Sequence, residues 1–136
     1  MALGGLVHVA AIFGGPDWYA FLGAPAGLVA MASTSSLRPA VSCVVIASAL
    51  FTCAAYAFSG AGVFLKLPAL RAVLSLIALG LIARGIIFVP VAAWQPHLLS
   101  GLCGKCGSVS VFLLVTSALC LIVGGGYAAG ALRVRA

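Results

Sequence analysis

The chain has 136 residues, of which 65% are hydrophobic and 6% are charged, and its seven Lys and Arg outweigh a single acid to give a net charge of +6. An average soluble domain is about half apolar and about a quarter charged, and a domain of this size still leaves close to a third of its unfolded-chain surface in water. The few charged side chains of this sequence could not cover that surface. The composition therefore excludes a water-soluble fold and indicates lipid as the solvent.

Lipid restricts the secondary structure, because unpaired backbone groups are not tolerated in hydrocarbon and only helices or closed barrels span it. Barrel strands would appear as segments of about ten residues with alternating polarity, and the sequence contains none. The sequence therefore predicts an all-α integral membrane protein. We expect residues 1–136 to form one transmembrane domain, a four-helix bundle whose first partner is the lipid bilayer.

The opening segment, residues 1–15, is apolar but reaches only about three-quarters of the roughly 20 residues that a crossing requires. Gly14, Gly15 and Pro16 then break it. We expect it to cross as the first helix, with flanking aromatic residues and local thinning of the bilayer compensating for its length. The alternative is three spans plus a re-entrant or interfacial N-terminal helix. A signal peptide is disfavoured, since no Lys or Arg precedes the apolar stretch.

Residues 16–38 are predicted to be an interfacial loop that includes a short helix over 26–32 on the membrane surface. Trp18 and Tyr19 belong at the headgroup level and are expected to be interfacial anchors, as is Trp94 further along the chain. The remaining spans are expected at about 39–59, 69–89 and 108–129, where the apolar runs reach the required length.

Orientation follows from the bases at the ends of the spans. One side carries Lys66, Arg71, Arg133 and Arg135, whereas Arg38 and Lys105 fall on the other. This excess places the C-terminus in the cytoplasm. The predicted location is therefore the bacterial inner (plasma) membrane, with several crossings.

Small residues in the predicted spans indicate close helix packing, which replaces hydrophobic burial as the source of helix association in lipid. Gly126 and Gly130 have GxxxG spacing and are interpreted as part of this packing. A homodimer seam is the alternative, so the possible partners are a second copy of the chain or a membrane partner subunit.

The predicted polar cluster consists of His8, Asp17 and Arg84. Arg84 lies inside the third predicted span, about five positions from Val89 and therefore roughly 8 Å below the outer interface. An Arg at that depth costs a few kcal/mol unless it snorkels or is paired. It either snorkels or pairs with Asp17, the only acid, which the topology places on the same side. His8 has a comparable depth, so the three side chains are expected to converge in the outer half.

Cys103 and Cys106 form a CxxC motif on the predicted outer side, where an oxidising compartment favours a disulfide. The position resembles that of the active CxxC in the vitamin K epoxide reductase family of quinone-linked membrane enzymes. That family also needs a second cysteine pair in the loop before the second helix, and residues 16–38 contain no cysteine. Cys43 and Cys53 cannot replace it, because ten helical residues separate them by about 15 Å. A structural disulfide or two incidental thiols are the preferred interpretations, and no metal site is expected because two further ligands are missing.

A broader resemblance covers most of the first three segments. The run from His8 to Tyr19 (HVAAIFGGPDWY), Ser59 to Gly62 with Leu67-Pro68, and Arg84-Gly85 resemble a family of small, uncharacterised bacterial inner-membrane proteins. The resemblance implies a four-helix fold and no known activity.

No carboxylate pair, nucleophile elbow or phosphate-binding glycine loop is present, so we predict no catalytic residue and no cofactor. Nucleic acid is not an expected partner, because no basic run alternates with aromatic residues. We expect a non-enzymatic membrane protein that binds a small or lipid-like ligand, or a partner subunit, through the polar cluster. The alternatives are an oligomeric small transporter or channel, and a thiol-disulfide oxidoreductase that uses the CGKC motif with quinone as cofactor.

Overall fold

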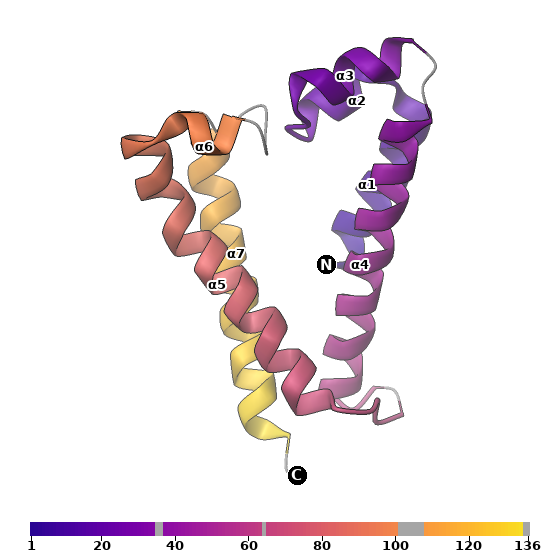
Figure 1. The fold of residues 1–136 in the computed structure, drawn as a ribbon. Coiled ribbons are helices and arrows are strands. Elements are labelled where there is room, and N and C mark those ends of the chain that lie inside the picture. Colours follow the sequence, from indigo (N-terminus) through magenta and orange to yellow (C-terminus); the bar gives the residue numbers. More distant parts are fainter. Residues whose placement is uncertain (35–36, 64, 101–107, 135–136) are drawn as a thin grey trace.

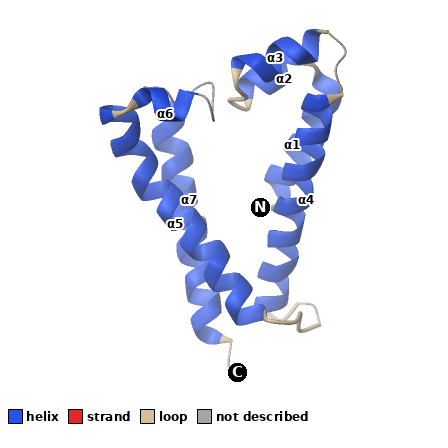
Figure 2. Ribbon diagram, in the orientation of Figure 1, coloured by secondary structure: helices blue, strands red, loops and turns tan. Residues whose placement is uncertain are grey.

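The computed structural model describes residues 1–34, 37–63, 65–100 and 108–134. These residues form seven helices and no strand (Figure 1 and Figure 2). The predicted all-helical class is therefore confirmed. The helices are α1 (Ala2–Gly14), α2 (Pro16–Phe21), α3 (Ala26–Ser33), α4 (Arg38–Gly60), α5 (Leu70–Trp94), α6 (Pro96–Ser100) and α7 (Val111–Arg133).

Three of these helices are long and apolar enough to cross a membrane. They are α4 with 23 residues, α5 with 25 and α7 with 23. At 1.5 Å per residue each extends about 35 Å, slightly more than a hydrocarbon core of about 30 Å. Helix α1 has 13 residues and extends only about 20 Å. The predicted four-helix bundle is not confirmed, because the first helix is too short to match the other three.

The helices are arranged in two arms that meet at one end and diverge toward the other (Figure 1). The first arm contains α1 to α4, with α1 packed along α4, and the second contains α5 and α7 packed against each other with α6 at their far end. Gly4 lies opposite Leu50, and Gly5 lies against the ring of Phe51. Helix α1 therefore covers α4 only in part, and Met1 lies beside Ala54, Ala57 and Phe58 of that helix.

The second arm is held by close approach of its two backbones. A Cβ atom placed on Gly85 of α5 would lie 2.7 Å from Cγ of Leu121 and 3.0 Å from the backbone oxygen of Ser117, both on α7. One placed on Gly124 of α7 would lie 2.9 Å from Cγ1 of Ile82. The two glycines thus let the helices approach to a distance that a side chain would prevent, as is common in membrane interfaces.

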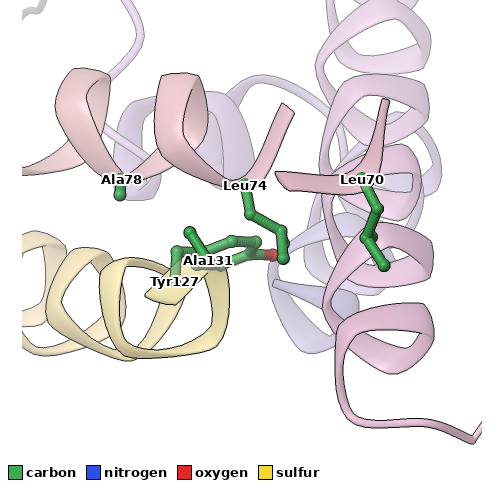
Figure 3. Packing of buried hydrophobic residues seen from close by; sticks show 5 residues of the cluster. All are labelled: Leu70, Leu74, Ala78, Tyr127 and Ala131. Carbon is green, nitrogen blue, oxygen red and sulfur yellow. The ribbon is translucent and has the colours of Figure 1, made fainter. Parts of the chain in front are cut away.

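The arms are joined at their meeting end by a small core. Its buried residues belong to the second arm and are Leu70, Leu74 and Ala78 from α5 with Tyr127 and Ala131 from α7 (Figure 3). Cys53, Tyr56 and Ala57 of α4 pack against them from the first arm. The Tyr127 hydroxyl donates a 2.7 Å hydrogen bond to the Cys53 backbone oxygen and so connects α7 to α4.

The loop between α4 and α5 is fixed from the last turn of α4. The Ser59 hydroxyl donates to the Leu65 backbone oxygen at 2.9 Å and accepts from the Leu67 amide at 3.1 Å. Ser59 itself is buried, with 3% of its surface exposed. One side chain therefore makes two hydrogen bonds to the backbone of this loop.

The third span is longer than the sequence indicates, since α5 continues through Pro90 and ends at Trp94 instead of Val89. A proline lacks a backbone N–H and commonly ends helices in water, whereas neighbouring helices and local adjustment let it remain inside helices in membranes. This extension leaves more helix beyond Arg84 than the sequence indicated. Residues 16–38 also contain more helix than expected, because α2 precedes α3 at the far end of the first arm.

Candidate functional site

A cavity of about 520 Å³ lies between the two arms, in the half where they diverge. It is bounded by residues of α1, α2 and α4, by the turn before α3, and by α5 and α7 across from them. Along α4 its lining extends from Pro39 to Leu50, which corresponds to about 16 Å of helix. Its chemistry-bearing residues are His8, Tyr19, Ser42, Cys43, Arg84 and Thr116.

Arg84 lies near the middle of α5. About 15 Å of helix separates it from Trp94, and about 21 Å separates it from Leu70. The predicted depth of about 8 Å was counted from Val89, and α5 continues five residues beyond that position to Trp94. A cation this far inside a spanning helix is costly and is normally associated with a partner or a functional site.

The Arg84 guanidinium contacts the Phe88 ring, with Cζ 4.3 Å from the ring centroid. Phe88 lies one turn closer to the end of α5, so the side chain extends in that direction. Its Nη1 atom is buried and has no hydrogen-bond partner. The aromatic face attracts the cation, but it leaves the N–H donors of Nη1 unused. Arg84 therefore brings an unsatisfied cationic donor to the cavity.

His8 lines the same cavity from α1. Its Nδ1 atom lies 2.8 Å from the Gly4 backbone oxygen. A carbonyl oxygen can only accept, so Nδ1 carries the proton in the neutral ring and Nε2 is left as a hydrogen-bond acceptor. The structure thus combines His8 and Arg84 at one cavity, as an acceptor and a cationic donor.

Two hydroxyl groups on the cavity wall are already used as donors. Ser42 donates to the Arg38 backbone oxygen at 3.0 Å, and Thr116 donates to the backbone oxygens of Phe112 at 2.9 Å and Leu113 at 3.1 Å. Their oxygens keep only acceptor capacity. Among these wall residues, Arg84 and the Tyr19 phenol keep strong donors for a ligand, and Arg84 is the one that carries a charge.

Asp17 does not join this group. It is exposed in the first turn of α2 and does not line the cavity. Within the described part of the chain, no ion pair connects it to Arg84, whose buried Nη1 has no partner. Asp17 and Tyr19 are two positions apart in α2, so their side chains point about 200° away from each other around the helix. Because Tyr19 faces inward, Asp17 faces outward. The position of Asp17 is favourable for another reason, since an acid near a helix N-terminus complements the helix dipole.

The three predicted aromatic anchors have different environments. Trp94 is 83% exposed at the end of α5, and Trp18 is 44% exposed, with its indole over Gly14. Tyr19 is instead buried with Ala11 and Cys43. Its burial raises the pKa of the Tyr19 phenol, with the nearby Cys43 as a second cause, so this side chain is a neutral hydroxyl on the cavity wall.

The CGKC motif falls outside the residues that the structure describes, so the predicted Cys103–Cys106 disulfide stays a prediction. Cys43, Cys53 and Cys120 are free thiols. Among the described residues, no group of three or more His, Cys, Asp or Glu is arranged to hold a metal ion.

Comparisons of this chain with protein-family models, with curated proteins and with solved structures find no match. The two family resemblances drawn from sequence motifs therefore stay predictions, and the candidate site is interpreted from its own geometry.

Sequence reasoning missed most of the cavity wall. Ser42 and Thr116 carry no recognisable signal, because hydroxyl residues that bond to their own helix are common in membrane spans. Phe88, which contacts Arg84, did have a signal in the sequence, since it is four residues after Arg84 and side chains at that spacing meet on a helix.

Proposed function

We propose that this chain is a non-enzymatic membrane protein that binds a lipid-like ligand with an anionic head in the cavity between its two arms. The observation that carries the proposal is the Arg84 guanidinium, which lines the cavity with a buried, unpartnered Nη1 atom. The anionic head is placed at Arg84, and the apolar part of the ligand is placed along the remaining wall.

The head-group chemistry follows from the donors and acceptors. A guanidinium presents parallel N–H donors that match a carboxylate or a phosphate. His8 lines the same cavity and offers an acceptor at Nε2, which suits a hydroxyl or a singly protonated phosphate, whereas a carboxylate engages Arg84 alone. A neutral ligand without an acceptor would leave Arg84 unsatisfied.

A single-chain amphiphile agrees with the size and lining of the cavity. Its volume of about 520 Å³ is within the range of about 300–1,000 Å³ that is typical of small-molecule sites. Beyond the polar residues, its walls are aliphatic and aromatic, including Leu22, Leu28, Ile46, Leu50 and Phe112. A two-chain phospholipid would exceed this space, so a long-chain carboxylate is the simplest ligand of this class.

The proposal places the cavity in the outer half of a bacterial inner membrane, with the C-terminal end in the cytoplasm. In the described residues, Lys66, Arg71 and Arg133 lie at the end where the arms meet, whereas Arg38 lies at the other end. An excess of bases marks the cytoplasmic side.

The test is binding of a fatty acid that carries a photoactivatable diazirine to the purified protein in detergent micelles. Arg84→Met replaces the arginine by an apolar side chain of similar length and so removes the charge. A charge-assisted hydrogen bond contributes about 1.5–3 kcal/mol, so the affinity should fall about 10- to 100-fold. Crosslinks in the wild-type protein should fall on cavity residues of α4 and α7.

Arg133→Met is the matched control, because Arg133 is an exposed residue in the last turn of α7 and does not line this cavity. It removes one charge without reaching the cavity and should change the affinity less than about twofold, a difference smaller than one hydrogen bond. Equal affinity in the wild-type protein and Arg84→Met, or crosslinks confined to the outer surface of the arms, would overturn the proposed function.

A further inference from the structure

A second cavity lies about 20 Å along α5 from Arg84, at the end where the two arms meet. Its volume is about 660 Å³, and it is formed by the end of the α4–α5 loop, the first turns of α5 and Val134 beyond α7. Lys66 and Arg71 both line it. It shares no residue with the cavity that contains Arg84.

The charge of this second cavity has no acidic counterpart in the chain. The only acid is Asp17, which lies in α2 at the opposite end of the molecule (Figure 1). Lys66 and Arg71 are both exposed, so their charged groups are available to a ligand. The Ser75 hydroxyl on the same wall donates to the Arg71 backbone oxygen at 2.9 Å, so Ser75 does not add a donor. Among the described residues of the lining, Lys66 and Arg71 are the charged ones, and they select an anion.

The rest of the wall is apolar. Leu67, Ala69, Leu70, Ala72 and Val134 lie beside the two cations. The cations are also at the correct level for a headgroup, because Lys66 precedes the spanning helix α5 and Arg71 lies in its first turn. A polar headgroup and an apolar chain attached to it would meet these two kinds of surface together.

We propose that this second cavity binds the phosphate headgroup of an anionic phospholipid, with Lys66 and Arg71 as its charge partners and the apolar wall in contact with its acyl chains. Basic pockets between membrane helices on the cytoplasmic side are known to hold such headgroups. The site is independent of the ligand proposed for Arg84, since neither cavity needs the other to be occupied.

The experiment measures lipid binding to the detergent-solubilised full chain by native mass spectrometry, with phosphatidylglycerol and phosphatidylcholine as probes. The wild-type protein should prefer phosphatidylglycerol. The double variant Lys66→Gln/Arg71→Gln should bind phosphatidylglycerol about thirtyfold more weakly, the change expected for two interfacial charges, and should bind phosphatidylcholine as the wild type does.

The control is Arg38→Gln/Arg133→Gln, which has the same net charge as the first double variant. Arg38 belongs to the opposite end, and Arg133 lines a separate cavity beside Gly130. If both double variants lost affinity for phosphatidylglycerol equally, the loss would be due to the change in net charge, and the proposed site would be overturned. Soluble glycerol phosphate distinguishes a lipid from a free phosphate: binding as tight as that of phosphatidylglycerol would overturn the assignment to a lipid.

Discussion

Substitution of Arg84 by methionine is expected to stabilise the ligand-free protein while weakening ligand binding. The Nη1 atom is buried without a hydrogen-bond partner, and leaving a buried donor unsatisfied costs about 1–3 kcal/mol. The contact between Arg84 and Phe88 does not offset this cost. Both residues belong to α5, so we expect the contact to be present also in the unfolded state, in which the helices are separated within the membrane. Arg84→Met should therefore raise the free energy of unfolding by about 1–2 kcal/mol.

The assay is reversible unfolding of the purified protein in mixed micelles, followed by loss of tertiary contacts as the denaturing detergent increases. Asp17→Asn is the matched control, and it should change the unfolding free energy by less than about 0.5 kcal/mol because exposed substitutions rarely do more. A structural ion pair between Asp17 and Arg84 would give a different result, because Asp17→Asn and Arg84→Met would then destabilise the protein by similar amounts. A loss of more than about 1 kcal/mol in Arg84→Met would refute the interpretation of Arg84 as an unpartnered binding residue.

Three further substitutions test how the arms are built. Gly85→Leu should lower the free energy of unfolding by about 1–3 kcal/mol, because the added side chain overpacks α5 against α7. Gly80 has open space around it, so Gly80→Leu should leave the unfolding midpoint almost unchanged. Equal effects of the two variants would contradict the close approach of α5 and α7 at Gly85. Tyr127→Phe should cost about 1 kcal/mol by removing the hydrogen bond between the arms, more than Tyr56→Phe, whose hydroxyl bond is 3.5 Å long; the same unfolding assay compares them. Ser59→Ala should cost about 1–2 kcal/mol and speed amide hydrogen exchange in the loop before α5, and unchanged exchange there would count against its role.

The long helices could be predicted from the sequence because their apolar runs are nearly continuous and match the thickness of a bilayer. Their ends were less predictable. Pro90 suggested a helix end in the third span, but α5 continues to Trp94. The difference bears on the site, since the predicted depth of Arg84 was counted from Val89 and the helix extends past that residue.

The candidate site was predictable only in part. The sequence identified His8 and Arg84 as unusual because ionisable side chains are rare in membrane spans, and the structure places both at one cavity. It could not place Asp17, because the direction of that side chain depends on Gly15. Gly15 has a φ of 73°, a left-handed conformation that favours glycine, and it sets the angle at which α2 leaves α1.

The divergence of the two arms could not be predicted either. Hydropathy gives the length of each span but not its tilt, which depends on packing between specific residues. Here the decisive contacts are between particular residues, such as Gly85 against Leu121 and Tyr127 against Cys53. In the part of the chain that the structure describes, they hold the second arm together and fasten it to the first at the end where the arms meet.

The most direct test of the central claim is solid-state NMR of the protein in lipid bilayers with a carboxylate-labelled fatty acid and ¹⁵N-labelled arginine. Dipolar coupling between the guanidinium nitrogens and the labelled carboxylate reports contact between the two groups. The coupling should be present in the wild-type protein and in Arg133→Met and should be lost in Arg84→Met. A coupling that persists in Arg84→Met, or none in the wild-type protein, would contradict binding of the head group at Arg84.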